Sequence, residues 1–189
     1  MTEMDTSVQP ITNLVEGLSA DERAEINDLA LRCFGPPELR QPHRLAIASN
    51  EDTRFIVRVW NDRLLVACLW INDRDILVGD CPTHMAGIRG VRTDPAFRLR
   101  GFASAAMRKA AEFIWNDVKP DIAMLHSSVM AVRLYQGLGW TIINGPVFCD
   151  QPAGKINVTE ELLENPIMVQ MPPGKEPPSG IVDLCGLPF

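Results

Sequence analysis

The order of segments in this sequence predicts an α+β fold, in which a mixed sheet carries helices on its faces. From residue 53 to residue 93 short apolar and β-branched runs follow one another closely, and from Gly101 to Ile143 helical and strand patterns alternate. The chain has 189 residues, of which 46% are hydrophobic. This length and composition suit one domain with a substantial core, so we expect residues 1–189 to form a single domain.

The first predicted element is a helix that begins after Ser19. Residues Ser19-Ala-Asp-Glu22 form a capping-box pattern, in which both end side chains bond to backbone N–H groups of the first turn. Gly35 and the two prolines that follow it predict the end of this helix. Apolar residues recur between these limits at helical spacing, at Ile26, Leu29, Ala30 and Cys33.

Strands follow from residue 53. A hairpin is predicted from Phe55–Trp60 and Leu64–Ile71, with Asn61-Asp62-Arg63 as its turn. Ile76–Gly79 and Met85–Thr93 predict two more strands. The remaining pattern predicts a helix from about Gly101 to Asn116, a strand at Ile122–His126, a helix at Ser128–Gln136 and a strand at Trp140–Ile143.

The C-terminal segment is rich in proline. Eight of the fifteen prolines lie from Pro146 onward, and proline cannot donate a hydrogen bond to a sheet. We therefore expect residues 146–189 to be an extended segment packed on the domain, with one strand at Ile167–Met171. The apolar residues at its end argue against a disordered tail; they include Ile181, Leu187 and Phe189.

Composition excludes several functional classes. The longest apolar run, Leu64–Ile71, is far shorter than the roughly 20 residues of a membrane-spanning helix. Residues 1–10 show no apolar stretch of a secretory signal, and the five cysteines form no CxxC pair, so we expect a cytoplasmic protein with reduced thiols and no metal. A structural zinc site or a disulfide framework is the alternative for the cysteines. A net charge of −6 argues against a nucleic-acid partner. It favours, weakly, a cationic acceptor such as an amine.

The most informative segment runs from Val91 to Ser104. A strand ends near Thr93, a short basic loop follows, and a helix opens at or just after Gly101. The first N–H groups of a helix lack internal partners and carry positive partial charge, and a glycine there lets a ligand approach the backbone closely. With Arg98 and Arg100 beside the same point, the segment predicts an anion site suited to a pyrophosphate. A charged turn that binds nothing is the alternative.

A second informative segment runs from Leu125 to Trp140. Its predicted helix places Ala131, Leu134 and Tyr135 on one face. Tyr135 is the only tyrosine of the chain. Its hydroxyl could take part in chemistry, or the ring could simply pack in the core with a backbone partner for the hydroxyl.

Together these two segments resemble the GNAT superfamily of acetyl-CoA-dependent N-acetyltransferases. The run V-x-T-x-P-x-x-R-x-x-G-x-A, which begins at Val91, is similar to the superfamily's CoA pyrophosphate motif. The run A-x-x-L-Y-x-x-L-G-W, which begins at Ala131, is similar to its later helix–strand motif. The resemblance implies a GNAT-type fold, with a mixed, mostly antiparallel sheet of about six or seven strands flanked by about four helices.

The resemblance also implies a mechanism with acetyl-CoA as cosubstrate and no metal. Backbone amides around Val91 and Thr93 would polarise the thioester carbonyl. The pantetheine arm would insert where Gly90–Thr93 and Ile122–His126 splay apart. An amine would attack the carbonyl directly, and Tyr135 would protonate the leaving CoA thiolate. The pyrophosphate would lie against the segment formed by Arg98, Leu99, Arg100, Gly101, Phe102, Ala103 and Ser104.

The general base is left open by the sequence. Many family members carry a glutamate on the fourth strand, but the matching stretch, residues 87–90, contains none. His126 lies at the end of the next strand and titrates in the useful range, so it is the first candidate. Asp80 and His84 are further candidates, and a water chain without a dedicated base is the alternative.

The acceptor is predicted only as a primary amine of a small molecule or a peptide. The run from Leu125 to Trp140, Gly145-Pro146 and an extended tail that ends at Phe189 resemble the aminoglycoside 2′-N-acetyltransferases, in which acidic side chains hold the cationic antibiotic. The matching positions here are Arg89 and Leu187, and a guanidinium would repel an ammonium group. The alternatives are aminoglycoside 2′-N-acetylation, a longer acyl donor held by a channel near Trp70, Met85 and Trp140, and a non-catalytic acyl-CoA-binding module. A homodimer is one candidate assembly.

Overall fold

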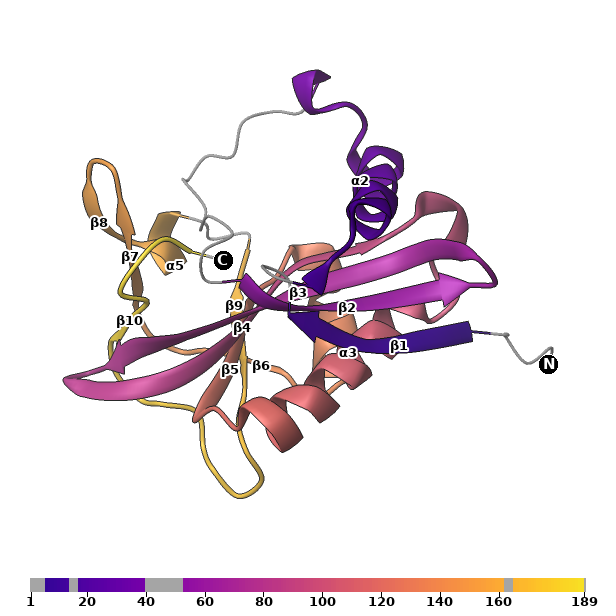
Figure 1. The fold of residues 1–189 in the computed structure, drawn as a ribbon. Coiled ribbons are helices and arrows are strands. Elements are labelled where there is room, and N and C mark those ends of the chain that lie inside the picture. The colour runs from indigo at the N-terminus through magenta and orange to yellow at the C-terminus, as the bar shows by residue number, and fades with distance from the viewer. Residues whose placement is uncertain (1–5, 14–16, 40–52, 162–164, 189) are drawn as a thin grey trace.

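The computed structural model describes residues 6–13, 17–39, 53–161 and 165–188. In this part of the chain ten strands form one mixed sheet, with helices on both of its faces (Figure 1). The helices are α2 (Ala20–Phe34), α3 (Phe102–Phe113), α4 (Val132–Gln136) and α5 (Val158–Glu161). The strands are β1 (Thr6–Asn13), β2 (Thr53–Asn61), β3 (Leu64–Val78), β4 (Cys81–Thr93), β5 (Ile122–His126), β6 (Thr141–Ile142), β7 (Val147–Gln151), β8 (Gly154–Asn157), β9 (Ile167–Gln170) and β10 (Val182–Asp183).

The predicted α+β class is therefore confirmed, with more strands than the six or seven expected. Strands β1 to β4 form an antiparallel meander. β4 then pairs with β5 in parallel, and β9 and β6 extend the sheet beyond β5 in antiparallel order. The long strand β3 pairs with β2 over its first part and with β10 at its end. β10 leads on to β7 and β8.

Helix α2 forms as its capping box predicts. The Ser19 N–H donates to Glu22 Oε2 at 2.8 Å, and the Glu22 N–H donates to Ser19 Oγ at 3.2 Å. Gly35, with φ of 70°, follows the last helical residue and its N–H donates to the Leu31 carbonyl. These contacts satisfy backbone groups at both helix ends, so the local sequence alone fixes the limits of α2.

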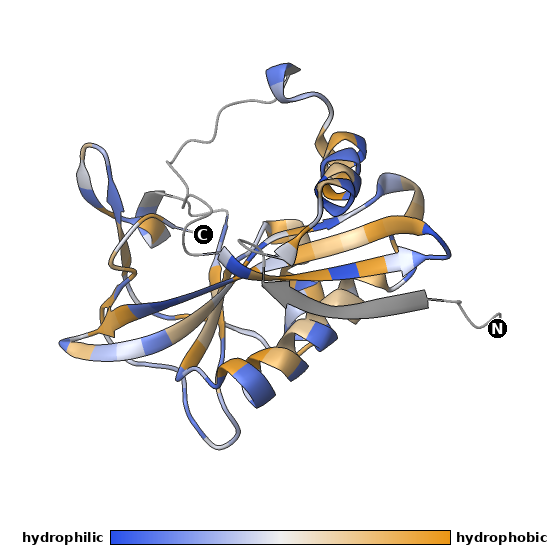
Figure 2. Cartoon of the chain, viewed as in Figure 1, coloured by the Kyte–Doolittle hydropathy of each residue, from blue (hydrophilic) through white to orange (hydrophobic). Residues whose placement is uncertain are grey.

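The two faces of the sheet bury different apolar clusters. On one face α3 and α4 pack on the central strands. On the other face α2 covers one part of the sheet, and α5, β7 and β10 cover a second part. Strand residues alternate between these faces; for example, Ala123 and Leu125 of β5 join the α3 face, whereas Ile122 and Met124 join the opposite one. Figure 2 shows apolar residues concentrated in the strands and many hydrophilic residues in α2 and at the hairpin ends.

Two sequence predictions about strands are wrong. Leu64–Ile71 and Ile76–Gly79 were expected as separate strands, but β3 runs through both without interruption. The polar residues between them suggested a break, yet their backbone stays paired with β4, and Asn72 is fully buried. Tertiary packing overrides local polarity here, because strand propensity depends strongly on context.

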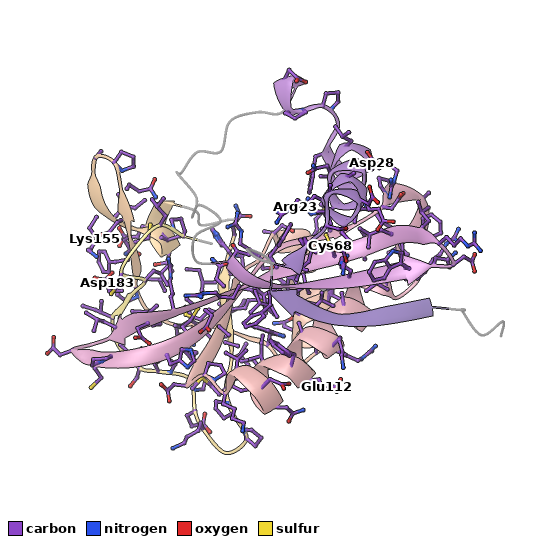
Figure 3. All side chains as sticks on the ribbon, viewed as in Figure 1. Arg23, Asp28, Cys68, Glu112, Lys155 and Asp183 are labelled. Carbon is purple, nitrogen blue, oxygen red and sulfur yellow. The ribbon has the colours of Figure 1, made fainter. Side chains whose placement is uncertain are left out.

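The second wrong prediction concerns the C-terminal segment. One strand was expected after Pro146, but β7, β8, β9 and β10 all lie there, together with α5. Ion pairs fix this segment: Lys155 Nζ lies 2.6 Å from Asp183 Oδ2 and 3.0 Å from Asp150 Oδ1. Figure 3 shows Lys155 and Asp183 side by side. The prolines fall between the strands, where they remove no ladder hydrogen bond. Phe189 lies outside the described residues.

Candidate active site

Strands β4 and β5 separate at the centre of the sheet. They pair from Met85 with Ile122 to Ile88 with Leu125, and no β4–β5 pair follows within the described residues. β4 nevertheless continues to Thr93 along β3, whereas His126 pairs with Ile167 of β9. Two parallel strands that diverge in this way leave backbone groups of both without a ladder partner. The predicted splay is therefore present, and it begins one residue before Gly90.

A β-bulge distorts β4 at this point. Trp70 pairs with Arg89 and Cys68 with Arg92, so two residues of β4 lie opposite one residue of β3. Gly90 has φ of 57°, a conformation that favours glycine. A Cβ on Gly90 would lie 2.9 Å from Trp70 Cδ1. A bulge leaves one residue outside the ladder and turns its backbone groups, so Gly90 and Val91 lie where the regular pairing of β4 with β3 is interrupted.

The loop after β4 leads into an open helix end. Asp94 caps a short 3₁₀ turn, Pro95–Phe97, by accepting from the Ala96 N–H at 2.9 Å. Gly101 follows in the left-handed region, with φ of 87°, and directly precedes α3. No side chain caps the N-terminus of α3. The first N–H groups of α3 therefore remain for another partner, as the sequence predicted.

The side chains of this loop are largely exposed. Arg98 is exposed, and its Nε donates to the Thr93 carbonyl at 3.3 Å. Arg100 lies over the Phe97 ring, 5.2 Å from its centroid. Both residues belong to the loop that directly precedes α3. Of the other predicted cofactor residues, Leu99 is fully exposed, Phe102 is buried, and Ala103 and Ser104 are half-buried in the first turn.

Asp94 anchors this loop to α2, a role that the sequence did not reveal. Its Oδ2 lies 2.6 Å from Arg32 Nε, and Arg32 Nη2 donates to the Leu65 carbonyl at 2.7 Å. The Asp94 side chain is buried, so the ion pair is shielded on one side from solvent. Arg32 lies 62 residues before Asp94 in the chain, and no local pattern could have predicted such a pair.

The hydroxyl of Thr93 is buried and has no hydrogen-bond partner within the described part of the chain. Val91, two residues earlier on the same strand, packs against the core of the α3 face. Because alternate strand residues share a face, Thr93 is directed to the α3 side of the splay. An unpaired buried hydroxyl lowers the stability of the folded state by about 1–3 kcal/mol. Its presence here is consistent with a ligand that would form the missing hydrogen bond.

Tyr135 is buried in the core of the α3 face, with 5% of its surface exposed. Burial raises its pKa to about 12, so the phenol stays protonated at neutral pH. The structure gives its hydroxyl no hydrogen-bond partner among the described residues. The alternative, a core tyrosine whose hydroxyl bonds to a backbone group, finds no such partner within the described residues, and the role of the hydroxyl stays a prediction.

His126 projects from the opposite face. It follows Met124 of the second core cluster by two residues, so its side chain lies on the face away from α3. Burial lowers its pKa, and a backbone hydrogen bond with Asn165 opposes this effect. Nε2 is buried and has no partner in the described part of the chain. A neutral imidazole with a free ring nitrogen can accept a proton or a hydrogen bond.

The other two base candidates lie far from the splay. His84 contacts Asp73, with 2.5 Å between Nε2 and Oδ1. It precedes Arg89 by five strand residues, which corresponds to about 17 Å. Asp80 lies still farther away, in the turn between β3 and β4. Neither residue lies where an amine could meet the splayed strands.

Two residues were expected to distinguish between acceptors, Arg89 and Leu187. Both lie on the same face of the sheet as His126. Arg89 Nη1 donates to Thr53 Oγ1 at 3.4 Å. The Leu187 carbonyl accepts from Arg74 Nη2 at 2.9 Å, and this bond ties the C-terminal segment to β3. The positions proposed for a long acyl channel do not meet, since Trp70, Met85 and Trp140 belong to three different core clusters.

No group of three or more histidine, cysteine or acidic side chains within the described residues lies close enough to hold a metal ion. No helix in that part of the chain combines the length and hydropathy needed to cross a membrane. The five cysteines are unpaired; Cys68 and Cys149 are buried, and Cys81 and Cys185 are exposed.

Splayed parallel strands, a glycine bulge and an uncapped helix N-terminus thus follow one another along β4 and into α3. The sequence profile of the family "Acetyltransferase (GNAT) domain" matches residues 15–143. The chain therefore belongs to the GNAT acetyltransferases, a family of enzymes that use acetyl-CoA. No curated protein sequence matches it.

Several solved structures share this fold. ElaA of Escherichia coli has a TM-score of 0.60 at 15% identity, over 87% of this chain and 99% of that chain. An acyl-CoA N-acyltransferase of Pseudomonas aeruginosa gives 0.58 at 16% identity, over 87% and 99%. Naa50 of Arabidopsis thaliana, in complex with the bisubstrate analogue CoA-Ac-MVNAL, gives 0.53 at 11% identity, over 87% and 97%. At these identities the likeness shows the fold alone.

Proposed function

We propose that this enzyme transfers the acetyl group of acetyl-CoA to a primary amine of a small molecule or a peptide. The observation that carries this proposal is the splay of β4 and β5, with the Gly90 bulge on one side of the opening and Tyr135 packed on the α3 face. The bulge presents backbone amides that can stabilise the oxyanion of a tetrahedral intermediate. Such a site suits acyl transfer.

The residues present also fit the CoA part of the donor. The open N-terminus of α3, with Gly101 in front of it, offers N–H groups to a pyrophosphate, and Arg98 and Arg100 add two positive charges. The unpaired hydroxyl of Thr93 lies at the end of β4, where the pantetheine arm would enter the splay. Both observations support CoA binding at this site, because the open helix end and the unpaired hydroxyl are groups that a ligand could satisfy.

The reaction follows from the placement of groups on the two faces. The neutral amine attacks the thioester carbonyl from the face of His126, the new C–N bond forms, and the C–S bond breaks. The amine loses one proton, for which His126 Nε2 is the best-placed acceptor, directly or through a water. The thiolate leaves towards the α3 face, where the Tyr135 phenol donates to it.

The pKa of Tyr135 determines how its hydroxyl can assist the departure of the CoA thiolate. A thiol ordinarily titrates near 8.5, so a phenol with a pKa of about 12 is a weaker acid by roughly three to four pH units. Full proton transfer before the C–S bond breaks would therefore be uphill. The phenol donates a hydrogen bond that stabilises the developing thiolate, and it keeps its own proton because the thiolate is the weaker base.

The acceptor is the least constrained part of the proposal. Arg89 places a cation on the acceptor face, which disfavours polycationic acceptors, so aminoglycoside 2′-N-acetylation stays a secondary hypothesis. A longer acyl donor also stays secondary, because the apolar residues expected to hold it lie in separate clusters.

A panel of primary amines tests the proposal. Free-thiol release from acetyl-CoA would be followed for the wild type and for Tyr135→Phe. We expect amine-dependent release in the wild type, and a kcat lower by about 10²–10⁴ in the variant, with acetyl-CoA affinity nearly unchanged by calorimetry. Wild-type turnover in Tyr135→Phe would reassign the phenol to packing. Thiol release that no amine accelerates would refute amine transfer.

A further inference from the structure

Asn72 is fully buried at the centre of the sheet, yet half of its amide is unpaired. Its Oδ1 accepts from Thr53 Oγ1 at 3.1 Å. Its Nδ2 has no hydrogen-bond partner within the described part of the chain. A buried donor without a partner costs about 1–3 kcal/mol of stability, so its presence needs an explanation.

The orientation of this amide follows from its neighbours. Arg89 Nη1 donates to Thr53 Oγ1, and a guanidinium has no acceptor atom. The Thr53 hydroxyl therefore uses its own proton for Asn72, which requires the amide oxygen on that side. The Nδ2 group consequently points away from Thr53. The chain from Arg89 through Thr53 to Asn72 is charge-assisted, which strengthens the donor at its end.

The same face carries His126, which is also only partly satisfied. Thr53, Asn72, Gly87 and Met124 form one row across β2, β3, β4 and β5. Gly87 adds no side chain between Asn72 and β5. His126 lies two residues beyond Met124, so its Cα is about 12 Å from that of Asn72. Two side chains that rise from one face at this spacing can contact a small group between them.

The two unpaired atoms are complementary in chemistry. Nδ2 of Asn72 can only donate, whereas Nε2 of neutral His126 can accept. The backbone bond with Asn165 then involves the other ring nitrogen of His126. A ligand that satisfies both atoms must carry a hydrogen-bond donor, such as an amine, and an oxygen acceptor close to it.

We propose that Asn72 donates a hydrogen bond to a carbonyl or carboxylate oxygen beside the reacting amine, so that the acceptor is an α-amino carbonyl compound. This inference rests on the proposed acetyl transfer and narrows its substrate class. The positive charge of Arg89 favours an oxygen with negative character at this position. Free amino acids, amino acid amides and peptide N-termini share this group. Asn72 is thus a specificity-determining residue on the acceptor face.

Matched acceptors test the inference. Alaninamide carries a carboxamide where isopropylamine carries a methyl group, and the two are otherwise identical. Both would be compared at equal concentrations of neutral amine in the thiol-release assay. We expect the wild type to prefer alaninamide in kcat/KM by about 10-fold or more. In Asn72→Asp the donor becomes an acceptor, so the ratio of kcat/KM for alaninamide to kcat/KM for isopropylamine should fall to about one. Alanine and a trialanine amide then distinguish a free amino acid from a peptide.

Two further variants separate recognition from folding. Asn116→Asp makes the same substitution at an exposed position after α3 and should keep the preference. Thr53→Val removes the hydroxyl that orients the amide and should weaken the preference while leaving the apolar volume similar. Thermal unfolding of each variant shows whether it is folded. An unchanged preference in folded Asn72→Asp, or no preference in the wild type, would overturn the inference and leave Nδ2 to a buried water.

Binding provides a readout that does not depend on turnover. Titration of alaninamide into the protein–CoA complex, followed by NMR, should show tighter binding than isopropylamine, and Asn72→Asp should remove the difference. If no amine accelerates thiol release but this Asn72-dependent binding is present, the proposed transfer fails and the recognition of the α-amino carbonyl group stands. If transfer occurs without any Asn72 dependence, the inference alone fails.

Discussion

Replacement of Gly90 by alanine tests the geometry of the bulge. The residue has φ of 57°, a region that costs other L-residues about 1–2 kcal/mol. The new Cβ would also lie 2.9 Å from Trp70 Cδ1 and 3.1 Å from Arg92 Nη2, so at least one aromatic ring must move. Overpacking of this kind adds about 1–3 kcal/mol. We therefore expect Gly90→Ala to lower the free energy of unfolding by about 2–5 kcal/mol.

Gly79 supplies a matched control at the other end of the same hairpin. Its φ is 60°, and a Cβ there would meet nothing within 4 Å. Gly79→Ala should cost only the conformational term, about 1–2 kcal/mol. The gain from a stiffer unfolded chain is the same in both variants and cancels in the comparison. Urea unfolding gives the two values, and scanning calorimetry should show the larger fall in melting temperature for Gly90→Ala.

Turnover adds a second, independent criterion. A shifted bulge misplaces the amides proposed to stabilise the oxyanion, and loss of one such donor costs on the order of 10²–10³ in kcat. Gly79→Ala, far from the splay, should retain wild-type kcat. Equal stability and equal turnover in the two variants would show that the Gly90 backbone has neither the tight contact nor the catalytic part assigned to it.

Three further outcomes are expected. Gly101→Asp should abolish CoA binding in calorimetry because it places a carboxylate beside the pyrophosphate, whereas Gly174→Asp, at a similar φ of 77°, should bind CoA normally; equal affinities would remove the assigned CoA site. Because burial lowers the pKa of His126, its contribution to stability should be complete above pH 6.5 and be lost as the pH falls, so urea unfolding of His126→Gln should depend less on pH below 6.5, with kcat/KM reduced at every pH; an unchanged pH dependence would contradict this. Kanamycin-type aminoglycosides should give little turnover, and rapid 2′-acetylation would show that Arg89 does not repel the acceptor.

The loop and the helix end that we propose to bind CoA were predictable because local sequence encodes them. Asp94, Pro95 and Gly101 act through backbone turns within a few residues of each other, and the helix end needs no distant partner. Helix α2 and the β2–β3 hairpin were predictable for the same reason. The bulge at Gly90 was not, because a positive φ in a strand depends on how Trp70 of the neighbouring strand packs.

The acceptor side could not be read in the same way. The polar stretch from Asn72 to Asp75 looks like a loop in the sequence, but it is the middle of a paired strand. The role of Asn72 becomes apparent only from its neighbours on the same face, Thr53, Arg89 and His126, and these residues come from three other strands. Only the register of the sheet reveals which of these side chains share a face.

The donor and the acceptor parts of the proposed site differ in the kind of atoms that bind the substrate. In the proposed site the donor binds mainly to backbone atoms, whose positions follow from glycines and turns and tolerate changes in nearby side chains. In the proposed site the acceptor contacts side chains instead. Each of these side chains lies on a strand that backbone pairing would hold in place even with another residue at that position. A single substitution at Asn72 or Arg89 can therefore change the accepted amine without loss of the fold or of CoA binding. Acceptor specificity in this enzyme should for that reason follow the residues at these two positions more closely than overall sequence identity.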